Sequence, residues 1–337
     1  MKTSVIDLGL TWSNPQLMQA LTAAFNQTEP AQIIINTTGS TGLNKRVQLS
    51  SKALFISAKL SNEILGASNG DIWSLLLPTN HIAGLNVLAR AITLDSEIVS
   101  VEGKAKFSAI VPTQLHRALS GDAQLLNHLQ NCQAVLVGGS ATSKELLESA
   151  KQHKINVVTT YGMTETSGGC VYNNVALPGV EVSTTEAGLL KIKGAVLADG
   201  YENQEQLWAA NFSDGWFTTN DLGEVRDGKV FVTGRADDVI ISGGENVSLI
   251  AVEKILLENF KGVKFLATSI SDSEWGQKLC LLSDAAIDQN EISELLQGKL
   301  GKASVPKEFL AVSEIPTIGI GKPDRVKASQ LFIDKQR

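Results

Sequence analysis

From residue 14 to about 160, short apolar runs alternate with segments whose apolar residues recur every three or four positions. The first such stripe is Leu17, Leu21 and Phe25, and Pro15 suits the first turn of that helix. Further helices are predicted at 51–65, 82–92, 113–130 and 143–152, and strands at 31–36, 72–77, 107–111, 134–138 and 155–160. This alternation predicts βαβ crossovers and a largely parallel sheet.

The pattern changes near residue 170, where short alternating runs are separated by glycines. Asp227-Gly228 between two such runs predicts a tight β-hairpin. Helical and strand patterns alternate again after Gly234, with helices predicted at 248–260 and 290–300 and strands at 263–270, 277–283 and 307–312. The sequence therefore predicts an α/β protein. We expect a large N-terminal domain (1–235) with a mainly parallel sheet plus a β-rich segment, and a small, mobile α+β C-terminal domain (236–337).

Composition narrows the class of protein. The 337 residues include 29 Lys+Arg against 35 Asp+Glu, a net charge of −6, which disfavours nucleic acid as the main partner. The three cysteines are far apart and form no CxxC pair, so we expect neither a disulfide framework nor a structural zinc site. The uncharged stretch 72–89 contains Pro78, Asn80 and His81, and the N-terminus lacks a signal-peptide pattern. We expect a cytoplasmic protein without membrane insertion.

A stretch rich in hydroxyls and glycine follows the strand predicted at 31–36. It contains a phosphate-loop candidate, Thr37, Thr38, Gly39, Ser40, Thr41, Gly42 and Lys45. Hydroxyls, turning glycines and a lysine suit phosphate oxygens, and we expect a helix to follow. It is not a Walker A loop, because Asn44 and Arg46 occupy positions that would need glycine and a hydroxyl residue. An ordinary Thr/Ser/Gly-rich turn is the alternative.

A second candidate is Tyr161-Gly162-Met163-Thr164-Glu165, after the strand predicted at 155–160. Ligands bind at the carboxyl ends of parallel strands. The Glu165 carboxylate could hold Mg²⁺, and the Thr164 hydroxyl could meet a phosphate. The alternative is that these residues are simply the start of a helix, where Thr and Glu are common.

Three further motifs contain charged residues beside glycine. They are Asn220-Asp221, the run 234–238 with Arg235 and Asp237, and the run 319–325 with Lys322; Gly243-Gly244 lies between the last two. Alone, each has an ordinary explanation: a turn residue, a surface ion pair or a solvated charge.

The order of these motifs resembles that of the adenylate-forming, acyl-activating superfamily, over residues 31–325. In that superfamily a carboxylate attacks ATP to give an acyl-adenylate, and a thiol, usually of coenzyme A, displaces AMP. The resemblance implies ATP, Mg²⁺ and coenzyme A as cofactor or co-substrates, and a small carboxylic acid as substrate.

The resemblance also implies roles for single residues. Tyr161 and Gly162 would lie near adenine with Gly139 and Ser140, and Thr164 would bind the α-phosphate. Glu165 would ligate Mg²⁺. Asp221 would accept the ribose hydroxyls, and Arg235 would contact ribose or phosphate. The phosphate-loop residues given above complete the implied ATP site.

Other residues would serve the acid, coenzyme A and domain rotation. The implied acyl-site residues are His81, Gly138, Ser167 and Gly168. Asp237 would be the hinge for the C-terminal domain, Gly243 and Gly244 would border the coenzyme A channel, and Lys322 would contact the carboxylate and α-phosphate. His81 could instead cap the following helix. The segment 316–318 lacks the basic residue common there in the superfamily.

Within the superfamily, segments 77–91 and 160–180 look like those of the o-succinylbenzoate–CoA ligases. Arg90 and Arg117 are both candidates for the second carboxylate of that substrate. Another aryl- or acyl-CoA ligase is the main alternative, followed by a carrier-loading module or a nucleotide-binding pseudoenzyme. Only about 35 residues precede the phosphate loop, fewer than is usual in the superfamily. A homodimer is one way to cover the surface that longer relatives bury there.

Overall fold

The structure, a computed structural model, describes residues 4–38, 44–318 and 322–335, with backbone alone at 38, 44, 318 and 322. The described chain forms two compact units. The first contains residues 4–38, 44–219 and 223–232, and the second contains 220–222 and the residues from Thr233 onward. The boundary therefore crosses strands β15 (Trp216–Arg226) and β16 (Lys229–Arg235).

The first unit contains a small sheet with strand order β1-β2-β3-β13. Its strands are β1 (Val5–Asp7), β2 (Gln32–Thr38), β3 (Asn44–Ser50) and β13 (Gly200–Tyr201). The helices beside it are α1 (Asn14–Phe25), α2 (Ser51–Ile64) and α3 (Ile82–Thr93). Ser13 and Ser50 cap the first two helices through their hydroxyls, and the buried Leu17, Leu21 and Leu54 join one core with the strands.

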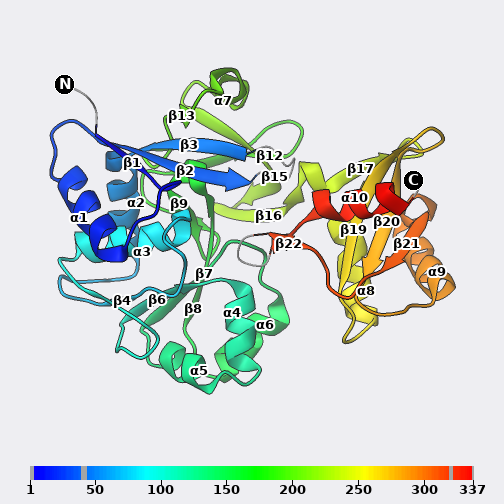
Figure 1. The fold of residues 1–337 in the computed structure, drawn as a ribbon, viewed down its shortest axis with the longest axis horizontal. Coiled ribbons are helices and arrows are strands. Elements are labelled where there is room, and N and C mark those ends of the chain that lie inside the picture. The colour runs from blue at the N-terminus through cyan, green and yellow to red at the C-terminus, as the bar shows by residue number, and fades with distance from the viewer. Residues whose placement is uncertain (1–3, 39–43, 319–321, 336–337) are drawn as a thin grey trace. The chain divides into compact units, whose positions relative to one another are not determined.

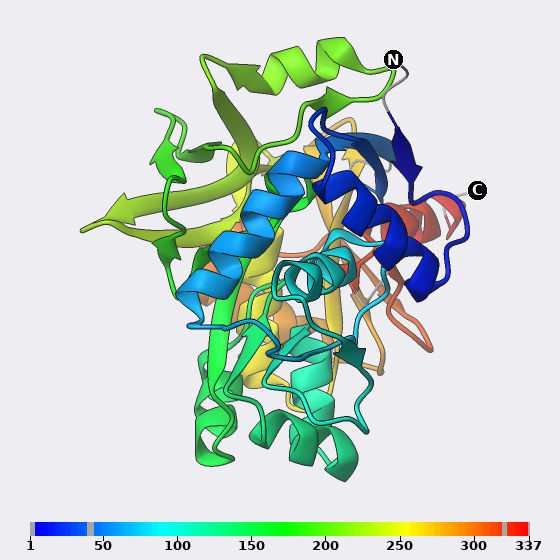
Figure 2. The same ribbon diagram turned by 90° about the vertical axis from the view of Figure 1, so that its left-hand side faces the viewer.

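The larger sheet has the order β11-β12-β15-β16-β10-β9-β8-β7-β6-β4-β5, and β14 pairs with β15. Its parallel half is β4 (Trp73–Ser74), β5 (Ile98–Val99), β6 (Phe107–Ile110), β7 (Ala134–Val137) and β8 (Val157–Met163). Its other strands are β9 (Gly168–Tyr172), β10 (Val175–Ala176), β11 (Glu181–Thr184), β12 (Leu189–Lys193) and β14 (Phe212–Ser213), with β15 and β16. The helices α4 (Pro112–Leu119), α5 (Ala123–Gln130) and α6 (Lys144–Gln152) share a core with β6 and β7. Both α2 and α3 contact β9, and Figure 2 shows α2, in blue, in front of the green strands of this sheet.

The second unit is a sheet covered on both faces. The sheet has the order β18-β17-β20-β19, with β21 beside β20, and a separate pair β22-β23. The strands are β17 (Val239–Ser242), β18 (Glu245–Ser248), β19 (Phe265–Asp272), β20 (Gly276–Ser283), β21 (Glu308–Ala311), β22 (Thr317–Ile318) and β23 (Lys322–Pro323). Leu279 and Leu281 pack with α8 (Leu249–Asn259) and α9 (Gln289–Leu300), whereas Cys280 and Leu282 pack with α10 (Arg325–Lys335). The two-residue period of a strand produces this division.

The α/β class, the parallel half-sheet and most predicted elements are confirmed. The expected hairpin forms between β15 and β16, with φ of 49° at Asp227 and 72° at Gly228. The structure differs from two expectations. The helix predicted over 113–130 is two helices, since the chain turns at Gly121 with φ of 127°. The phosphate-loop segment leads first into strand β3, which was not predicted, and only then into the expected helix, α2.

Candidate functional site

The phosphate-loop segment joins the antiparallel strands β2 and β3. Thr37 pairs with Lys45 across these strands, so both side chains belong to the same end of the hairpin. Gly39, Ser40, Thr41 and Gly42 lie outside the described residues, as does the side chain of Thr38.

Lys45, Tyr201 and Glu165 form a cluster beside this segment. The Lys45 ammonium lies 5.0 Å from the centroid of the Tyr201 ring, and the Tyr201 hydroxyl donates to the Glu165 carboxylate at 2.7 Å. Burial, together with the negative charge of Glu165, raises the pKa of Tyr201, so the phenol stays a proton donor at neutral pH. The structure thus brings together a predicted phosphate ligand and the predicted metal ligand.

The turn that carries Glu165 has a fixed geometry. Residues Thr164–Thr166 form a short 3₁₀ turn between β8 and β9. The Thr166 hydroxyl accepts from the Met163 amide at 2.9 Å and lies 2.7 Å from the Gly168 carbonyl. A Cβ at Gly162 would lie 2.0 Å from the Gly168 carbonyl oxygen, which explains why glycine occupies this position. Thr164 itself is buried, with 8% of its surface exposed.

The donor set fits Mg²⁺ delivered with a nucleotide. Among the described residues no group of three or more His, Cys, Asp or Glu side chains gathers as a metal cage. Mg²⁺ prefers hard oxygen ligands and is commonly held by one or two carboxylates together with substrate phosphates. Glu165 supplies one such carboxylate, and Tyr201 is the only described side chain that hydrogen-bonds it.

The predicted acyl-site residues have different surroundings. Ser167 is fully buried in a left-handed conformation (φ 52°), and its hydroxyl donates to the Val196 carbonyl at 2.8 Å. The Ser167 hydroxyl is therefore engaged by the backbone of this unit. Gly168 has φ of 95°, and a Cβ there would lie 2.4 Å from the Asn86 amide nitrogen. Only glycine suits this position.

His81 and the loop after β7 also lie in the first unit. His81 is the N-cap residue of α3, yet its side chain makes no capping hydrogen bond, so the capping alternative fails. A Cβ at Gly138 would lie 2.2 Å from the Thr160 hydroxyl oxygen. Gly139 has φ of 88° and Ser140 is exposed.

The two arginines proposed for a second carboxylate are occupied differently. Arg90 is only 4% exposed; its guanidinium lies 4.9 Å from the Trp73 ring and donates to the Tyr172 hydroxyl at 3.2 Å. Arg117 is exposed and forms an ion pair with Asp122 at 3.1 Å.

In the second unit, Arg235 connects Asp221 with Asp237. Arg235 donates to Asp221 at 2.8 Å and forms a two-point contact with Asp237 at 2.8 and 2.9 Å. Burial alone would lower the pKa of Arg235, but the hydrogen bonds to Asp237 and the charge of Asp221 raise it. Asp221 is 7% exposed, so the predicted ribose ligand is nearly buried.

The remaining predicted residues of the second unit lie on a tight turn and on a short strand. Gly243 and Gly244, with φ of 60° and 82°, form the two-residue turn between β17 and β18. Lys322 pairs with Ile318 through its backbone, and its side chain lies outside the described residues. Arg325, three residues later, donates to Asp238 at 2.6 Å and also pairs with Glu253.

A model of the family described as AMP-binding enzyme matches residues 11–202, more than half of the chain. The chain belongs to the AMP-binding enzyme family. The match covers every predicted site residue of the first unit.

Relatives of this AMP-binding enzyme have more specific descriptions. A probable 2-succinylbenzoate–CoA ligase of Mycobacterium tuberculosis is 32% identical over 94% of this chain and 88% of its own length. An o-succinylbenzoate CoA synthetase from Bacillus subtilis, solved with its acyl-adenylate intermediate, is 26% identical with a TM-score of 0.75, over 88% of this chain and 68% of that one. The same Bacillus enzyme with ATP and a magnesium ion gives 25% and 0.74, over 88% and 69%. The adenylate-forming fold expected from the motifs is thus confirmed.

Sequence reasoning missed Tyr201 in this AMP-binding enzyme. The residue lies 36 positions from Glu165, and no spacing links the two. The only available signal was scarcity, since the chain contains three tyrosines and Tyr161 already had a predicted role.

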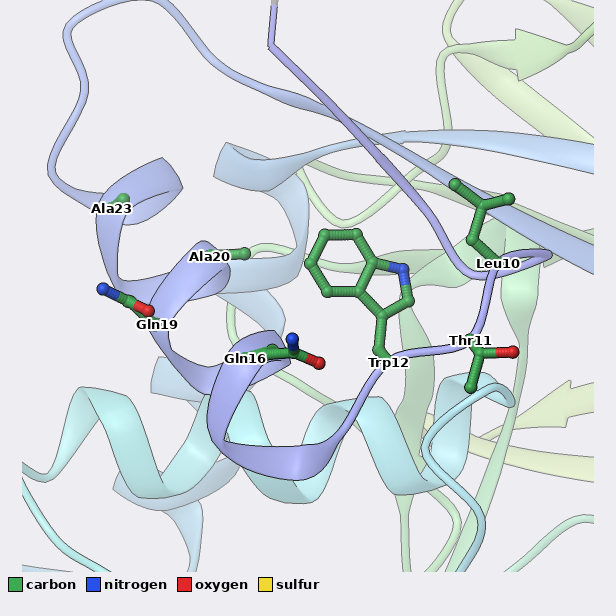
Figure 3. A pocket seen from close by; sticks show the side chains of 7 residues that line it. All are labelled: Leu10, Thr11, Trp12, Gln16, Gln19, Ala20 and Ala23. Atoms are coloured by element: carbon green, nitrogen blue, oxygen red, sulfur yellow. The ribbon is translucent and has the colours of Figure 1, made fainter.

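One pocket lies apart from these residues. It has a volume of about 520 Å³, and Figure 3 shows the Trp12 indole between Leu10 and helix α1. Its lining residues are Leu10, Thr11, Trp12, Gln16, Gln19, Ala20 and Ala23, none of which is a predicted site residue. Among the described residues, no helix has the length and apolar character needed to span a membrane.

Proposed function

We propose that this chain is an acid–thiol ligase that adenylates o-succinylbenzoate with ATP, releases pyrophosphate and transfers the acyl group to coenzyme A, a step of menaquinone biosynthesis. The carrying observation is the 32% identity to a probable 2-succinylbenzoate–CoA ligase along 94% of this chain. The Bacillus relative bound to its acyl-adenylate supports the same reaction. The Lys45–Tyr201–Glu165 cluster supports phosphate chemistry independently of any name.

The chemical task is to bring a carboxylate to a triphosphate of the same sign of charge. Lys45 and the phosphate-loop donors hold the phosphates, the Thr164 hydroxyl donates to the α-phosphate, and Lys322 contacts both reacting groups. Glu165 would hold the Mg²⁺ that accompanies ATP, and the ion would supply charge neutralisation at the phosphate oxygens. The carboxylate oxygen then attacks the α-phosphorus, and pyrophosphate leaves as the new P–O bond forms.

The remaining site residues bind and orient. Tyr161, with Gly139 and Ser140, borders adenine, and Asp221 accepts the ribose hydroxyls while Arg235 holds that carboxylate in place. His81, Gly138 and Gly168 border the acid. In the second half-reaction the thiol sulfur attacks the acyl carbonyl and AMP leaves. The 236–337 domain rotates at Asp237 between the two steps and presents the Gly243–Gly244 turn to coenzyme A.

Lys322→Ala tests this division of labour. We expect pyrophosphate release to fall by about 100-fold or more, because one charged donor to the transition state is lost. Thioester formation from supplied o-succinylbenzoyl-adenylate should stay near wild type. Lys327→Ala is the matched control, because Lys327 is exposed on helix α10, just after Lys322 in the chain, and this variant should retain both reactions. Equal loss of both half-reactions in Lys322→Ala would refute the assignment.

A panel of carboxylic acids tests the substrate. Pyrophosphate release with ATP, followed by a CoA-thioester assay, should be most efficient with o-succinylbenzoate. Faster turnover of a medium-chain fatty acid would instead support the alternative of another acyl-CoA ligase.

A further inference from the structure

Tyr201 stands between two groups of opposite charge. The Lys45 ammonium lies over the face of its ring, and the Glu165 carboxylate accepts from its hydroxyl at the other end. Lys45 and Glu165 form no direct ion pair within 4.0 Å among the described contacts, although both lie against the same side chain.

The position of Tyr201 is rigidly determined. Tyr201 is 2% exposed, and its backbone pairs through β13 and β3 with Val47, which lies two residues after Lys45 on the same strand. Trp208 contacts the ring edge-on with centroids 5.2 Å apart, and Trp208 stacks in turn on Phe217 at 5.1 Å. A side chain packed on these sides has little freedom to follow its partners.

We propose that Tyr201 is a positioning residue that keeps Lys45 and Glu165 apart and aims the Glu165 carboxylate at the metal of metal–ATP. This inference rests on the proposed function, which makes Glu165 the Mg²⁺ ligand. The hydroxyl engages one carboxylate oxygen and leaves the other for the cation, as hydrogen-bond donors around metal ligands commonly do. The cation–π contact with the ring face positions Lys45 and leaves its ammonium hydrogens free to bind phosphate oxygens.

Two variants of Tyr201 separate the effects of its two ends. Tyr201→Phe removes the hydroxyl and keeps the ring, so it loses the hydrogen bond to Glu165 but retains the cation–π contact with Lys45. Tyr201→Leu removes both and allows Lys45 and Glu165 to approach each other. A direct pair between them would withdraw the lysine from phosphate and the carboxylate from the cation.

Tyr172→Phe is a matched control. Tyr172 is 4% exposed in the same unit, and its hydroxyl is also hydrogen-bonded, to Ser61 at 2.8 Å and to Arg90 at 3.2 Å. Loss of a buried tyrosine hydroxyl should therefore destabilise both phenylalanine variants similarly, as thermal unfolding would show. Only the Tyr201 variant should change metal-dependent binding.

The experiment is calorimetric titration of ATP into the full chain, once with Mg²⁺ and once with EDTA. The dissociation constant in EDTA divided by that in Mg²⁺ measures the gain in ATP affinity due to the metal. We expect Tyr201→Phe to reduce this ratio about tenfold or more, with the EDTA value unchanged. Tyr201→Leu should also weaken binding in EDTA, and Tyr172→Phe should match wild type.

Glu165→Gln makes the failures of the two proposals distinguishable. If Glu165→Gln reduces the ratio and Tyr201→Phe does not, Tyr201 has no positioning role and the proposed function stands. If Glu165→Gln leaves the ratio unchanged, Glu165 is not the metal ligand, and the assignment under the proposed function is refuted together with this inference.

Discussion

Replacement of Gly138 by alanine would place a methyl group against the strand that leads to Tyr161. The added Cβ would lie 2.2 Å from the Thr160 hydroxyl oxygen and 3.2 Å from the Thr160 carbonyl oxygen. Ordinary contact begins near 3.4 Å, so the first separation must grow by about 3.4 − 2.2 = 1.2 Å. The loop after β7, the strand β8, or both must shift.

The expected cost follows from this overlap. Overpacking of this kind destabilises by about 1–3 kcal/mol. Thr160→Ala removes the hydroxyl oxygen and leaves the carbonyl contact, which a shift of a few tenths of an ångström relieves. Thr160→Ala alone loses a long hydrogen bond to the Val137 carbonyl (3.4 Å) and should cost about 1 kcal/mol or less. The double variant should therefore recover at least about 1 kcal/mol relative to additivity.

Wild type, Gly138→Ala, Thr160→Ala and the double variant form a double-mutant cycle. Urea denaturation of these four proteins measures the coupling free energy between the two positions, and the KM for ATP measures the effect on the nucleotide site. Gly138→Ala should raise this KM, and the double variant should restore it in part. Gly298→Ala is the control, because Gly298 is exposed in α9 and nothing lies within 4 Å of its added Cβ. It should be neutral or slightly stabilising. Additive effects in the cycle, or a Gly138→Ala protein with wild-type stability, would refute the steric explanation.

Further predictions concern charge and thiol chemistry. Burial would raise the pKa of Asp7, but hydrogen bonds from Arg46 and the Gly9 amide lower it overall, so its contribution to stability is present above pH 3.8 and is lost as the pH falls further. Asp7→Asn should lower the free energy of unfolding by up to about 1 kcal/mol at pH 7, and this difference should shrink steadily as the pH falls below 3.8; pH-dependent denaturation would contradict this if the difference stayed constant in acid. Burial raises the pKa of Cys132 to about 11 and of Cys170 and Cys280 to about 12. All three thiols should react slowly with Ellman's reagent in the native protein at pH 8 and fully in denaturant, whereas rapid native labelling would show that a cysteine is accessible.

Sequence periodicity identified elements whose buried residues recur with a single spacing. It failed at the 113–130 segment because Leu115, Ala118, Leu125 and Leu129 keep a helical spacing across the break at Gly121. Strand β3 was missed because of the residues that precede it. Its buried residues Val47 and Leu49 alternate as in any strand, but they closely follow the stretch rich in hydroxyls and glycine that suggested a loop.

The same limits apply to the candidate site. Motif order located the turn that carries Glu165, because the glycines and hydroxyls that shape it are contiguous in sequence. The direction of the Ser167 side chain depends on a left-handed backbone and on the distant Val196 carbonyl, and local sequence contains neither. Tyr201 reaches Glu165 only because β13 pairs with β3, a tertiary contact between distant segments.

The second unit indicates how a rotation at Asp237 would move Lys322. Arg325 lies just after the β22–β23 pair and donates to Asp238, the residue that follows the proposed hinge. The same guanidinium donates to the Ala267 carbonyl at 2.6 Å and pairs with Glu253 on α8, so it joins the start of α10 to β19 and α8 as well. Removing one partner of such a buried charge network is costly, so these elements remain together during thermal motion. A change of φ and ψ at Asp237 would then carry the backbone of Lys322 together with the rest of the chain after Asp237, as the proposed role of this lysine in one half-reaction requires.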